Sequence, residues 1–284
     1  MDLVKRRCPL CDGDRHRTVF RARDLNSKTT DHDFDVVRCR CRMTYLNPVP
    51  RDLSRHYPTA YDAHRDLGDG TKRRRHSHRF DRVLDLPPGD LLDVGCGSGF
   101  DLLAMRDRHW RVAGVEMNPQ AVERARAQGL DVRQGTLSEA NFPAASFDVV
   151  TLFHVLEHVT DVLALVREIR RILRPGGVML AQVPNFDGAN ARLFKAAWYE
   201  LDVPRHVNFF SSATLRDLVG RASLEVASLR WIESAADFRR SFKNRFGHTA
   251  GLRAAKPLLK AAFTVLNFWR TGDMLEIVAR HRVR

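Results

Sequence analysis

LLDVGCGSGF, residues 91–100, is the stretch that decides the fold of this chain. Its apolar start predicts a strand that ends in Asp93. Glycines at alternate positions from Gly95 to Gly99 then predict a turn that leads into a helical stretch, Asp101–Arg108. Because glycine has no Cβ, such a turn can bend sharply and approach a ligand closely. The following helix offers free N–H groups and a dipole that favour an anionic group, so the turn predicts a ligand site.

The next expected strand, Val112–Glu116, ends in an acid. In dinucleotide-binding folds an acid at this place holds the hydroxyls of a ribose. A glycine-rich turn alone is weak evidence, because many α/β proteins have one. The turn together with Glu116 indicates a cofactor that carries a nucleoside.

Strand and helix patterns alternate after the turn, which predicts a doubly wound, mostly parallel sheet with helices on both faces. Asn118 and Asp161 stand where helix caps are expected. Ligands of such sheets bind beyond the carboxyl ends of the strands. Seven strands are expected: Leu91–Asp93, Val112–Glu116, Asp131–Gln134, Phe147–Phe153, Val178–Val183, Glu225–Trp231 and Met274–Ala279.

Composition excludes some classes of protein but does not identify the substrate. No apolar run reaches the roughly 18 residues of a spanning helix, and the first residues lack the apolar core of a secretory signal, so we expect a cytoplasmic protein. The formal net charge of +13 indicates attraction to anions, which include a phosphorylated substrate, nucleic acid and a membrane surface. A high arginine content that reflects genomic composition is the alternative.

Two cysteine pairs near the start have the spacing of a small metal site. Thiolate pairs joined by a loop are typical of a structural zinc ribbon, and a second pair with one intervening residue departs from the usual two. A vestigial knuckle with free thiols is the alternative, as is a site in which a histidine replaces one thiolate. The expected zinc ligands are Cys8, Cys11, Cys39 and Cys41, the substitute histidines are His16, His32 and His56, and Cys96 in the glycine turn is expected to be a packing residue.

The chain divides into three expected parts. A zinc-ribbon-like module covers residues 1–48, a linker and helical bridge covers 49–90, and the sheet domain covers 91–284. Within the last, we expect a substrate-covering insertion around 186–215 and a C-terminal lid or interface helix around 239–272. The basic run Lys72–Arg75 is either a solvated helix face or an anion-binding patch. The apolar helix expected near Pro257–Arg270 is a lid, a dimer contact, a core helix or a peripheral membrane contact.

Several motifs resemble one known family. The G-x-G-x-G spacing resembles motif I of the class I S-adenosyl-L-methionine-dependent methyltransferases. FDVVTLFHVLEHVTD (147–161) and VREIRRILRPGGVMLAQVPN (166–185) are similar to a segment of the ubiquinone-biosynthesis O-methyltransferases and their small-molecule relatives. The cysteine knuckle and DVPRHVNFF (202–210) resemble bacterial relatives with an N-terminal zinc-binding module. The resemblance implies a Rossmann-like methyltransferase fold.

The resemblance also implies which residues hold S-adenosylmethionine. The glycine turn would surround its methionine part, Glu116 would hold the ribose, and the following residue would lie beside the adenine. Thr136 stands where the family often has an acid near the adenine amine. The implied cofactor-binding residues are Asp93, Gly95, Gly97, Gly99, Glu116, Met117, Thr136, Leu137 and Phe153.

The expected catalytic residues are His154, Glu157, His158 and His206. A histidine near neutral pKa suits a base that activates a hydroxyl. The quinone enzymes carry Glu-x-x-Glu-His at 154–158, resembling a divalent-metal site that acidifies a hydroxyl, and His154 replaces the first glutamate. An inverted zincin motif and a turn that Glu157 and His158 merely orient are the alternatives. Arg205 is a candidate ligand for an anionic acceptor.

These features predict an S-adenosylmethionine-dependent methyltransferase that transfers a methyl group to a small-molecule acceptor, by O-methylation with histidine assistance. One alternative is an rRNA or tRNA base methyltransferase whose basic stretches grip phosphates. The other is a non-catalytic protein that binds the cofactor. The acceptor and the oligomeric state do not follow from the sequence.

Overall fold

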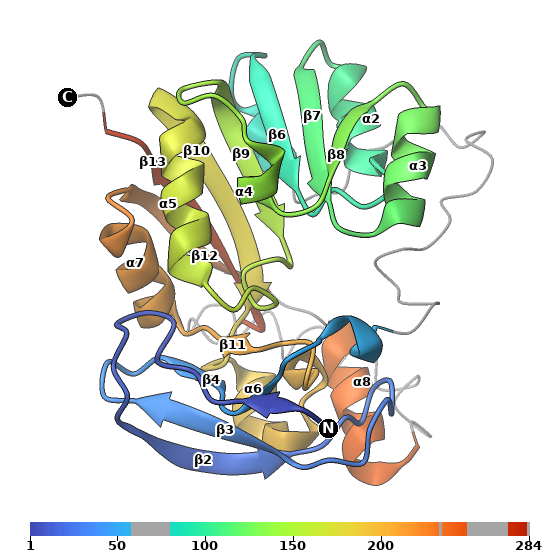
Figure 1. Cartoon of the computed structure of the whole chain (residues 1–284), viewed down its shortest axis with the longest axis vertical. Helices are drawn as coiled ribbons and strands as arrows, with labels where there is room; N and C mark the ends of the chain where they lie inside the picture. Colours follow the sequence, from blue (N-terminus) through green and yellow to red (C-terminus); the bar gives the residue numbers. More distant parts are fainter. Residues whose placement is uncertain (58–79, 233–234, 249–271, 283–284) are drawn as a thin grey trace.

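The computed structural model describes residues 1–57, 80–232, 235–248 and 272–282. Figure 1 shows that the molecule has two parts, one at each end of its long axis. A large sheet with helices on both faces forms one end, and the N-terminal strands lie at the other end beside α6 (Ala189–Phe194) and α8 (Ala235–Phe246). The expected positions Lys72–Arg75 and Pro257–Arg270 lie outside the described residues.

The large sheet has the strand order β12-β13-β10-β9-β6-β7-β8. Its strands from β10 to β8 are parallel, and β13 runs antiparallel between β10 and β12. This arrangement confirms the prediction of a doubly wound, mostly parallel seven-stranded sheet. The strands are β6 (Asp90–Val94), β7 (Arg111–Glu116), β8 (Asp131–Gln134), β9 (Phe147–Phe153), β10 (Leu173–Pro184), β12 (Glu225–Ile232) and β13 (Met274–Arg280).

Strand β9 lies at the centre because its sequence is apolar on both faces. Its residues are buried except for the half-buried Asp148, as expected for a strand covered by helices on both sides. One covering helix is α5 (Val162–Ile172), whose apolar side is buried. Asp161 caps it by accepting a hydrogen bond from the Ala164 amide at 3.0 Å, as predicted.

The remaining helices follow their local signals. Asn118 caps α3 by accepting from Ala121 N at 3.1 Å, with a proline at the first helical position, where its missing N–H costs nothing. The helices not yet bounded are α1 (Asp81–Leu84), α2 (Phe100–Arg106), α3 (Pro119–Ala127), α4 (Leu137–Ala140), α7 (Ser212–Arg221) and the short 3-10 turns η1 (Ser54–His56), η4 (Lys195–Ala197) and η5 (Tyr199–Leu201).

The N-terminal strands form a second sheet that includes a strand from far along the chain. Its order is β11-β4-β3-β2, all antiparallel, and β11 (Asn208–Phe209) comes from the expected insertion. Phe209 and Phe210 are buried and pack in the core. The other strands are β1 (Leu3–Val4), β2 (His16–Ala22), β3 (Phe34–Cys39), β4 (Thr44–Leu46) and β5 (Val49–Pro50).

The first residues and the insertion therefore pack as one unit. Arg6 donates to the Val207 carbonyl at 2.6 Å and to Asn208 Oδ1 at 2.8 Å, which fixes the N-terminus on β11. A shared apolar core joins Phe34 of β3 to Trp198 of the insertion. None of the helices that the structure describes has the length and apolar character needed to cross a bilayer.

Candidate functional site

A cavity of about 2220 Å³ opens beyond the carboxyl ends of β6, β7 and β9. Parallel strands end at the same edge of a sheet, so residues that follow different strands meet there. The cavity wall includes Gly95 and Gly97 after β6, Glu116 at the end of β7, and His154 after β9. The insertion contributes His206 to the same wall.

The glycine turn has backbone angles that other residues rarely adopt. Gly95, Gly97 and Gly99 have φ of 75°, 56° and 80°. A Cβ on Gly95 would lie 2.7 Å from Cγ2 of Val155, which is too close for any real contact. Positive φ and crowding both require glycine here, so the turn can bring bare backbone to a ligand.

Glu116 is buried and held by backbone amides. Its Oε2 accepts from Gly97 N at 3.0 Å and its Oε1 from Asn118 N at 2.8 Å. Each oxygen has two lone pairs, so the carboxylate retains acceptor capacity toward the cavity. Asp93 is fixed in a similar way, because Oγ1 of Thr151 donates to its Oδ1 at 2.7 Å.

The other expected cofactor residues also line the cavity, and some have a second structural role. Met117 is 70% exposed. Thr136 caps α4 in a capping box with Glu139, so its hydroxyl is already engaged. Leu137 and Phe153 are buried apolar lining residues.

Cys96 packs inside the turn. A Cβ on Gly114 would lie 2.5 Å from Sγ of Cys96, so the thiol occupies the space that this glycine leaves. Burial raises the pKa of the Cys96 thiol, and the carboxylates of Asp93 and Glu116 raise it further. A thiol kept protonated is a poor nucleophile, in agreement with the packing role predicted for it.

His154 begins the turn after β9 in a strained conformation. Its φ is 57°, a left-handed value that is uncommon outside glycine and is enriched at functional sites. Its ring Nδ1 lies 3.2 Å from Oε1 of Glu157, and 40% of its side chain is exposed. Glu157 thus orients a histidine that faces the cavity.

His158 and His206 come together from segments that lie far apart in sequence. Their ring centroids are 4.6 Å apart. His158 Nδ1 lies 3.1 Å from the Arg205 carbonyl, and His206 Nδ1 lies 2.7 Å from the Glu200 carbonyl. A carbonyl only accepts, so each Nδ1 donates to it and Nε2 is the ring nitrogen left to meet a ligand.

Glu157, His158 and His206 form a cluster whose ligand atoms lie within 4.8 Å of one another. In the part of the chain that the structure describes, Oε2 of Glu157 is buried without a hydrogen-bond partner. Burial opposes the charge of Glu157, but the bond from His154 and the neighbouring histidines outweigh it, so its pKa is lowered. Burial and the charge of His206 lower the pKa of His158 to about 4, which keeps this imidazole neutral near pH 7.

The insertion holds this turn in place. Nδ2 of Asn208 donates to the carbonyls of Leu156 and Val159 at 2.9 and 2.7 Å. The Tyr57 hydroxyl lies 2.9 Å from Nδ1 of His158. Side chains from the insertion and from the segment that follows the N-terminal strands therefore set the position of the histidines.

Arg205 does not bind a substrate anion, which corrects the expectation for this residue. Its side chain is fully buried, and its guanidinium contacts Asp24 at 2.8 Å and Asp202 at 2.6 Å. It also donates to the His56 carbonyl at 2.9 Å. All of these partners belong to the protein, so Arg205 ties the N-terminal strands to the insertion.

Sequence reasoning missed two carboxylates, Glu200 and Asp237, that line the cavity together with His206. Burial raises the pKa of Glu200 well above its ordinary value, and the carboxylates of Asp237 and Asp202 raise it further. A protonated carboxyl can donate a hydrogen bond. No local motif marks Glu200, because its partner Asp237 lies in α8 and the two residues meet only in the fold.

The four cysteines of the N-terminal pairs gather as a ribbon site requires. Sγ of Cys8 lies 3.5 Å from that of Cys41, and Sγ of Cys11 lies 3.6 Å from that of Cys39. All four thiols are free and lie within 4.8 Å of one another, so the single intervening residue of the second pair does not prevent their approach. The histidines expected as substitutes are not part of this group of ligand atoms. His16 contacts Tyr45, His32 packs on Phe34, and His56 contacts Thr29.

Known proteins match the chain over the region that builds the cavity. Residues 63–229, more than half of the chain, match the family described as a methyltransferase domain. A Mycolicibacterium smegmatis protein named "Probable S-adenosylmethionine-dependent methyltransferase" is 36% identical over 157 residues, which cover 54% of this chain and 59% of that protein. The ubiquinone biosynthesis O-methyltransferase of Idiomarina loihiensis is 31% identical over 150 residues, which cover 48% of this chain and 61% of the relative. The chain thus spans about three fifths of the length of these relatives.

Solved structures share the fold. A methyltransferase from Archaeoglobus fulgidus that depends on S-adenosylmethionine superposes with a TM-score of 0.53 at 15% identity, covering 71% of this chain and 91% of the other. At this identity, the similarity is one of architecture.

Proposed function

Since the chain belongs to the methyltransferase domain family, we propose that it transfers a methyl group from S-adenosylmethionine to the hydroxyl of a small molecule. The methyl group would pass from the sulfonium sulfur to the acceptor oxygen, and the hydroxyl proton would pass to a histidine. S-Adenosylhomocysteine and a methyl ether would be the products.

One observation carries this proposal. A single cavity contains both the glycine turn with Glu116 and the histidines that follow β9 and occupy the insertion. The sulfonium is already reactive, so the protein must mainly align the acceptor with the S–CH₃ bond and exclude water. Residues that fit the cofactor and residues that fit a base thus face the same space.

The fit of S-adenosylmethionine rests on the backbone as much as on side chains. The turn at Gly95–Gly99 admits close approach, and Glu116 keeps acceptor capacity for ribose hydroxyls. Asp93 would face the methionine part of the cofactor. Met117 and Phe153 would contact the adenine as apolar walls.

His154 is the proposed general base. With Nδ1 turned toward Glu157 at 3.2 Å, its Nε2 is the basic atom, and the ionised Glu157 stabilises the imidazolium that proton transfer creates. His158, with its pKa lowered to about 4, is a weaker base at neutral pH. Its proposed part, shared with His206, is to position the acceptor or to hold a metal.

Glu157, His158 and His206 fit a divalent metal ion. Two imidazoles, each oriented through Nδ1 by a carbonyl, and one carboxylate with an unsatisfied oxygen form a donor set that such metals accept. When bound, the ion would lower the pKa of a hydroxyl that coordinates it. Whether or not a metal binds, His154 remains outside this set and available as the base.

A structural zinc ion is proposed for Cys8, Cys11, Cys39 and Cys41. Purified protein should carry about one zinc at this site, because four thiolates complete a tetrahedral shell. Replacing Cys8 and Cys11 with Ser should release that ion and destabilise the N-terminal strands. Metal analysis with a matched Cys96→Ser variant, which should keep its zinc, checks this proposal. A wild-type protein that is fully folded and free of zinc would contradict it.

The proposed reaction is tested with a methyl-labelled cofactor. The purified protein would receive S-adenosylmethionine labelled in its methyl group, a panel of phenols, catechols and polyols, and, separately, total cellular RNA. We expect label in a small-molecule product, with a rate that falls in His154→Ala. Label in RNA alone would replace this acceptor class with the nucleic-acid alternative.

A further inference from the structure

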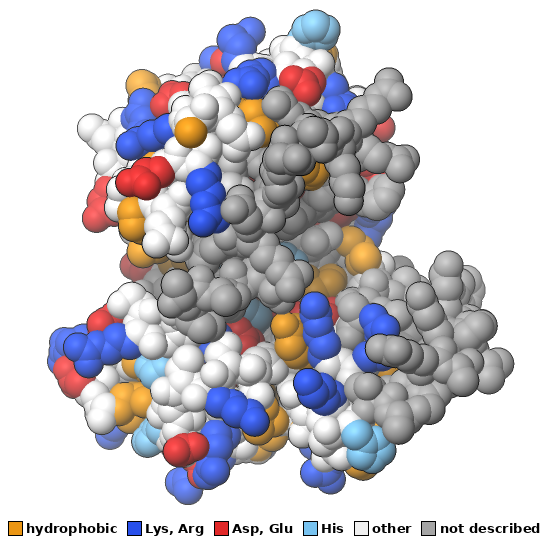
Figure 2. Space-filling model, turned by 90° about the vertical axis from the view of Figure 1, so that its right-hand side faces the viewer, with side chains coloured by type: hydrophobic (Ala, Val, Ile, Leu, Met, Phe, Trp, Pro, Cys, Tyr) orange, Lys and Arg blue, Asp and Glu red, His pale blue; other side chains and the backbone are white. Residues whose placement is uncertain are grey.

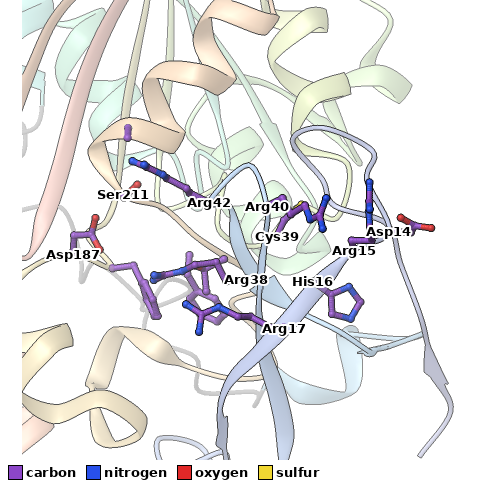
Figure 3. A pocket seen from close by; sticks show the side chains of 14 residues that line it. Asp14, Arg15, His16, Arg17, Arg38, Cys39, Arg40, Arg42, Asp187 and Ser211 are labelled. Carbon is purple, nitrogen blue, oxygen red and sulfur yellow. The ribbon is translucent and has the colours of Figure 1, made fainter.

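A second cavity, of about 900 Å³, lies outside the proposed active site (Figure 3). It is formed where the β2–β3 hairpin, the turn after β3 and the start of α7 meet. Its volume is within the range of small-molecule sites. The lining residues are Asp14, Arg15, His16, Arg17, Arg38, Cys39, Arg40, Arg42, Thr44, Phe186, Asp187, Phe209, Ser211 and Ala213.

The lining carries more positive than negative charge. Five of the lining residues are arginines and two are aspartates. On the face shown in Figure 2, Lys and Arg side chains are interspersed with Asp and Glu over the upper part, where the large sheet lies, and fewer Asp and Glu are visible among them in the lower part. No described carboxylate lies within ion-pair distance of Arg17, Arg38 or Arg42. Their charges are therefore available to a ligand.

Two of these arginines repel each other within the sheet. Arg17 and Arg38 are direct partners in the antiparallel register of β2 and β3, a placement in which like charges destabilise the pair. By contrast, Arg21 on the same strand faces its partner Asp35 and forms an ion pair at 3.0 Å. An anion that contacts both arginines would remove the repulsion.

The other wall of the cavity adds donors and an apolar surface. Figure 3 shows Arg38 and Arg42 on the side of Ser211, which caps α7. Ser211 and Thr214 satisfy each other in the cap, so the first-turn amides between them are free to bind an anion. Arg38 is held by Oγ1 of Thr44 at 3.0 Å, with its guanidinium carbon 5.8 Å from the ring centroid of Phe186.

We propose that this cavity binds a small organic diphosphate of the nucleotide type. Its phosphates would lie between Arg17, Arg38, Arg42 and the start of α7, where charge-assisted bonds are strong. Its ring would rest against the part of the half-buried Phe186 side chain that Phe20, Phe209 and Arg38 leave uncovered. The site is distinct from the proposed methyl-transfer cavity and does not depend on its chemistry.

Calorimetry on the full chain tests this proposal with uridine diphosphate and inorganic pyrophosphate as probes. S-Adenosylhomocysteine is kept saturating, so that the probes cannot report on the adenosine site. Both probes should bind, and uridine diphosphate should bind more tightly. The double variant Arg17→Gln with Arg42→Gln should weaken both by about tenfold or more.

Two further variants make the assignment specific. Arg21→Gln with Arg23→Gln removes two exposed charges at the far end of β2 and should change neither affinity by more than about twofold. Phe186→Leu should weaken uridine diphosphate by about fivefold or more and leave pyrophosphate unchanged. Equal losses in both double variants, or no binding of either probe, would overturn the proposal. Tight binding of single-stranded oligouridylate without binding of uridine diphosphate would replace it with an RNA-binding face.

Discussion

The two sides of the proposed active-site cavity are built in different ways. Most of the proposed cofactor side comes from one continuous stretch, from Asp93 to Asn118, in which Glu116 bonds to amides of the same stretch. The acceptor side joins Tyr57, the turn after β9 and His206 of the insertion. The first side depends on local backbone geometry, whereas the second exists only when the N-terminal strands dock on the insertion.

The difference shows why the N-terminal strands belong to the site. Buried Arg205 joins Asp24 of the N-terminal part to Asp202 of the insertion, directly beside His206. Asn208 of the same segment holds the carbonyls of the histidine turn. A loss of docking should therefore disturb the acceptor side and spare the cofactor side.

The largest expected effect is that of Arg205→Met. It leaves two buried carboxylates unpaired, a change that costs about 3–5 kcal/mol. Chemical denaturation followed by circular dichroism measures the loss in free energy of unfolding. Arg21→Met, which breaks an exposed ion pair with Asp35, is the matched control and should change stability by a small fraction of that. Similar losses in both variants would show that the buried network does not join the two parts.

Next in size is the effect of His154→Ala on methyl transfer. We expect turnover to fall by roughly 10²-fold, as for a lost general base, while S-adenosylhomocysteine affinity stays within about threefold. His109→Ala, a change at an exposed histidine far from the cavity lining, is the control. If turnover survives in His154→Ala and fails in His206→Ala, the base lies on the insertion instead.

A smaller effect concerns acid stability. The ion pair with Arg205 and the bonds from Thr29 and Ser27 outweigh burial and lower the pKa of Asp24. A carboxyl with a lowered folded-state pKa adds stability above its unfolded pKa of roughly 3.9, and this stability disappears as the pH falls further. Thermal melts of the wild type between pH 6 and pH 3 should therefore show a steeper acid loss than melts of Asp24→Asn, which is less stable at neutral pH. Parallel curves would exclude Asp24 as the group that titrates.

What the sequence could predict follows the same division. The pattern of apolar runs gave β8 and β9 with their observed ends, and the caps Asn118 and Asp161 were placed correctly, because these features depend on neighbours along the chain. The four cysteines met as the pairing of their spacings indicated. Each of these features can be predicted from residues that lie near one another in the sequence.

The remainder depends on contacts that no local pattern encodes. Strand β11 has two residues, too few for a periodic signal, and its partner β4 lies more than 150 residues earlier. Arg205 was expected to bind an anionic acceptor, because its buried partner Asp24 is 181 residues away and no local pattern points to it. The meeting of His158 with His206 depends on the same docking.

The central claim is tested most directly by calorimetric titration of S-adenosylhomocysteine into the wild type, Gly97→Val and His206→Ala. The account predicts that the wild type binds, that a valine at the left-handed Gly97 abolishes binding, and that His206→Ala stays within about threefold of the wild type, because only the first change touches the cofactor side. Unchanged affinity in Gly97→Val, or an equal loss in His206→Ala, would contradict the division of the cavity into a cofactor side and an acceptor side.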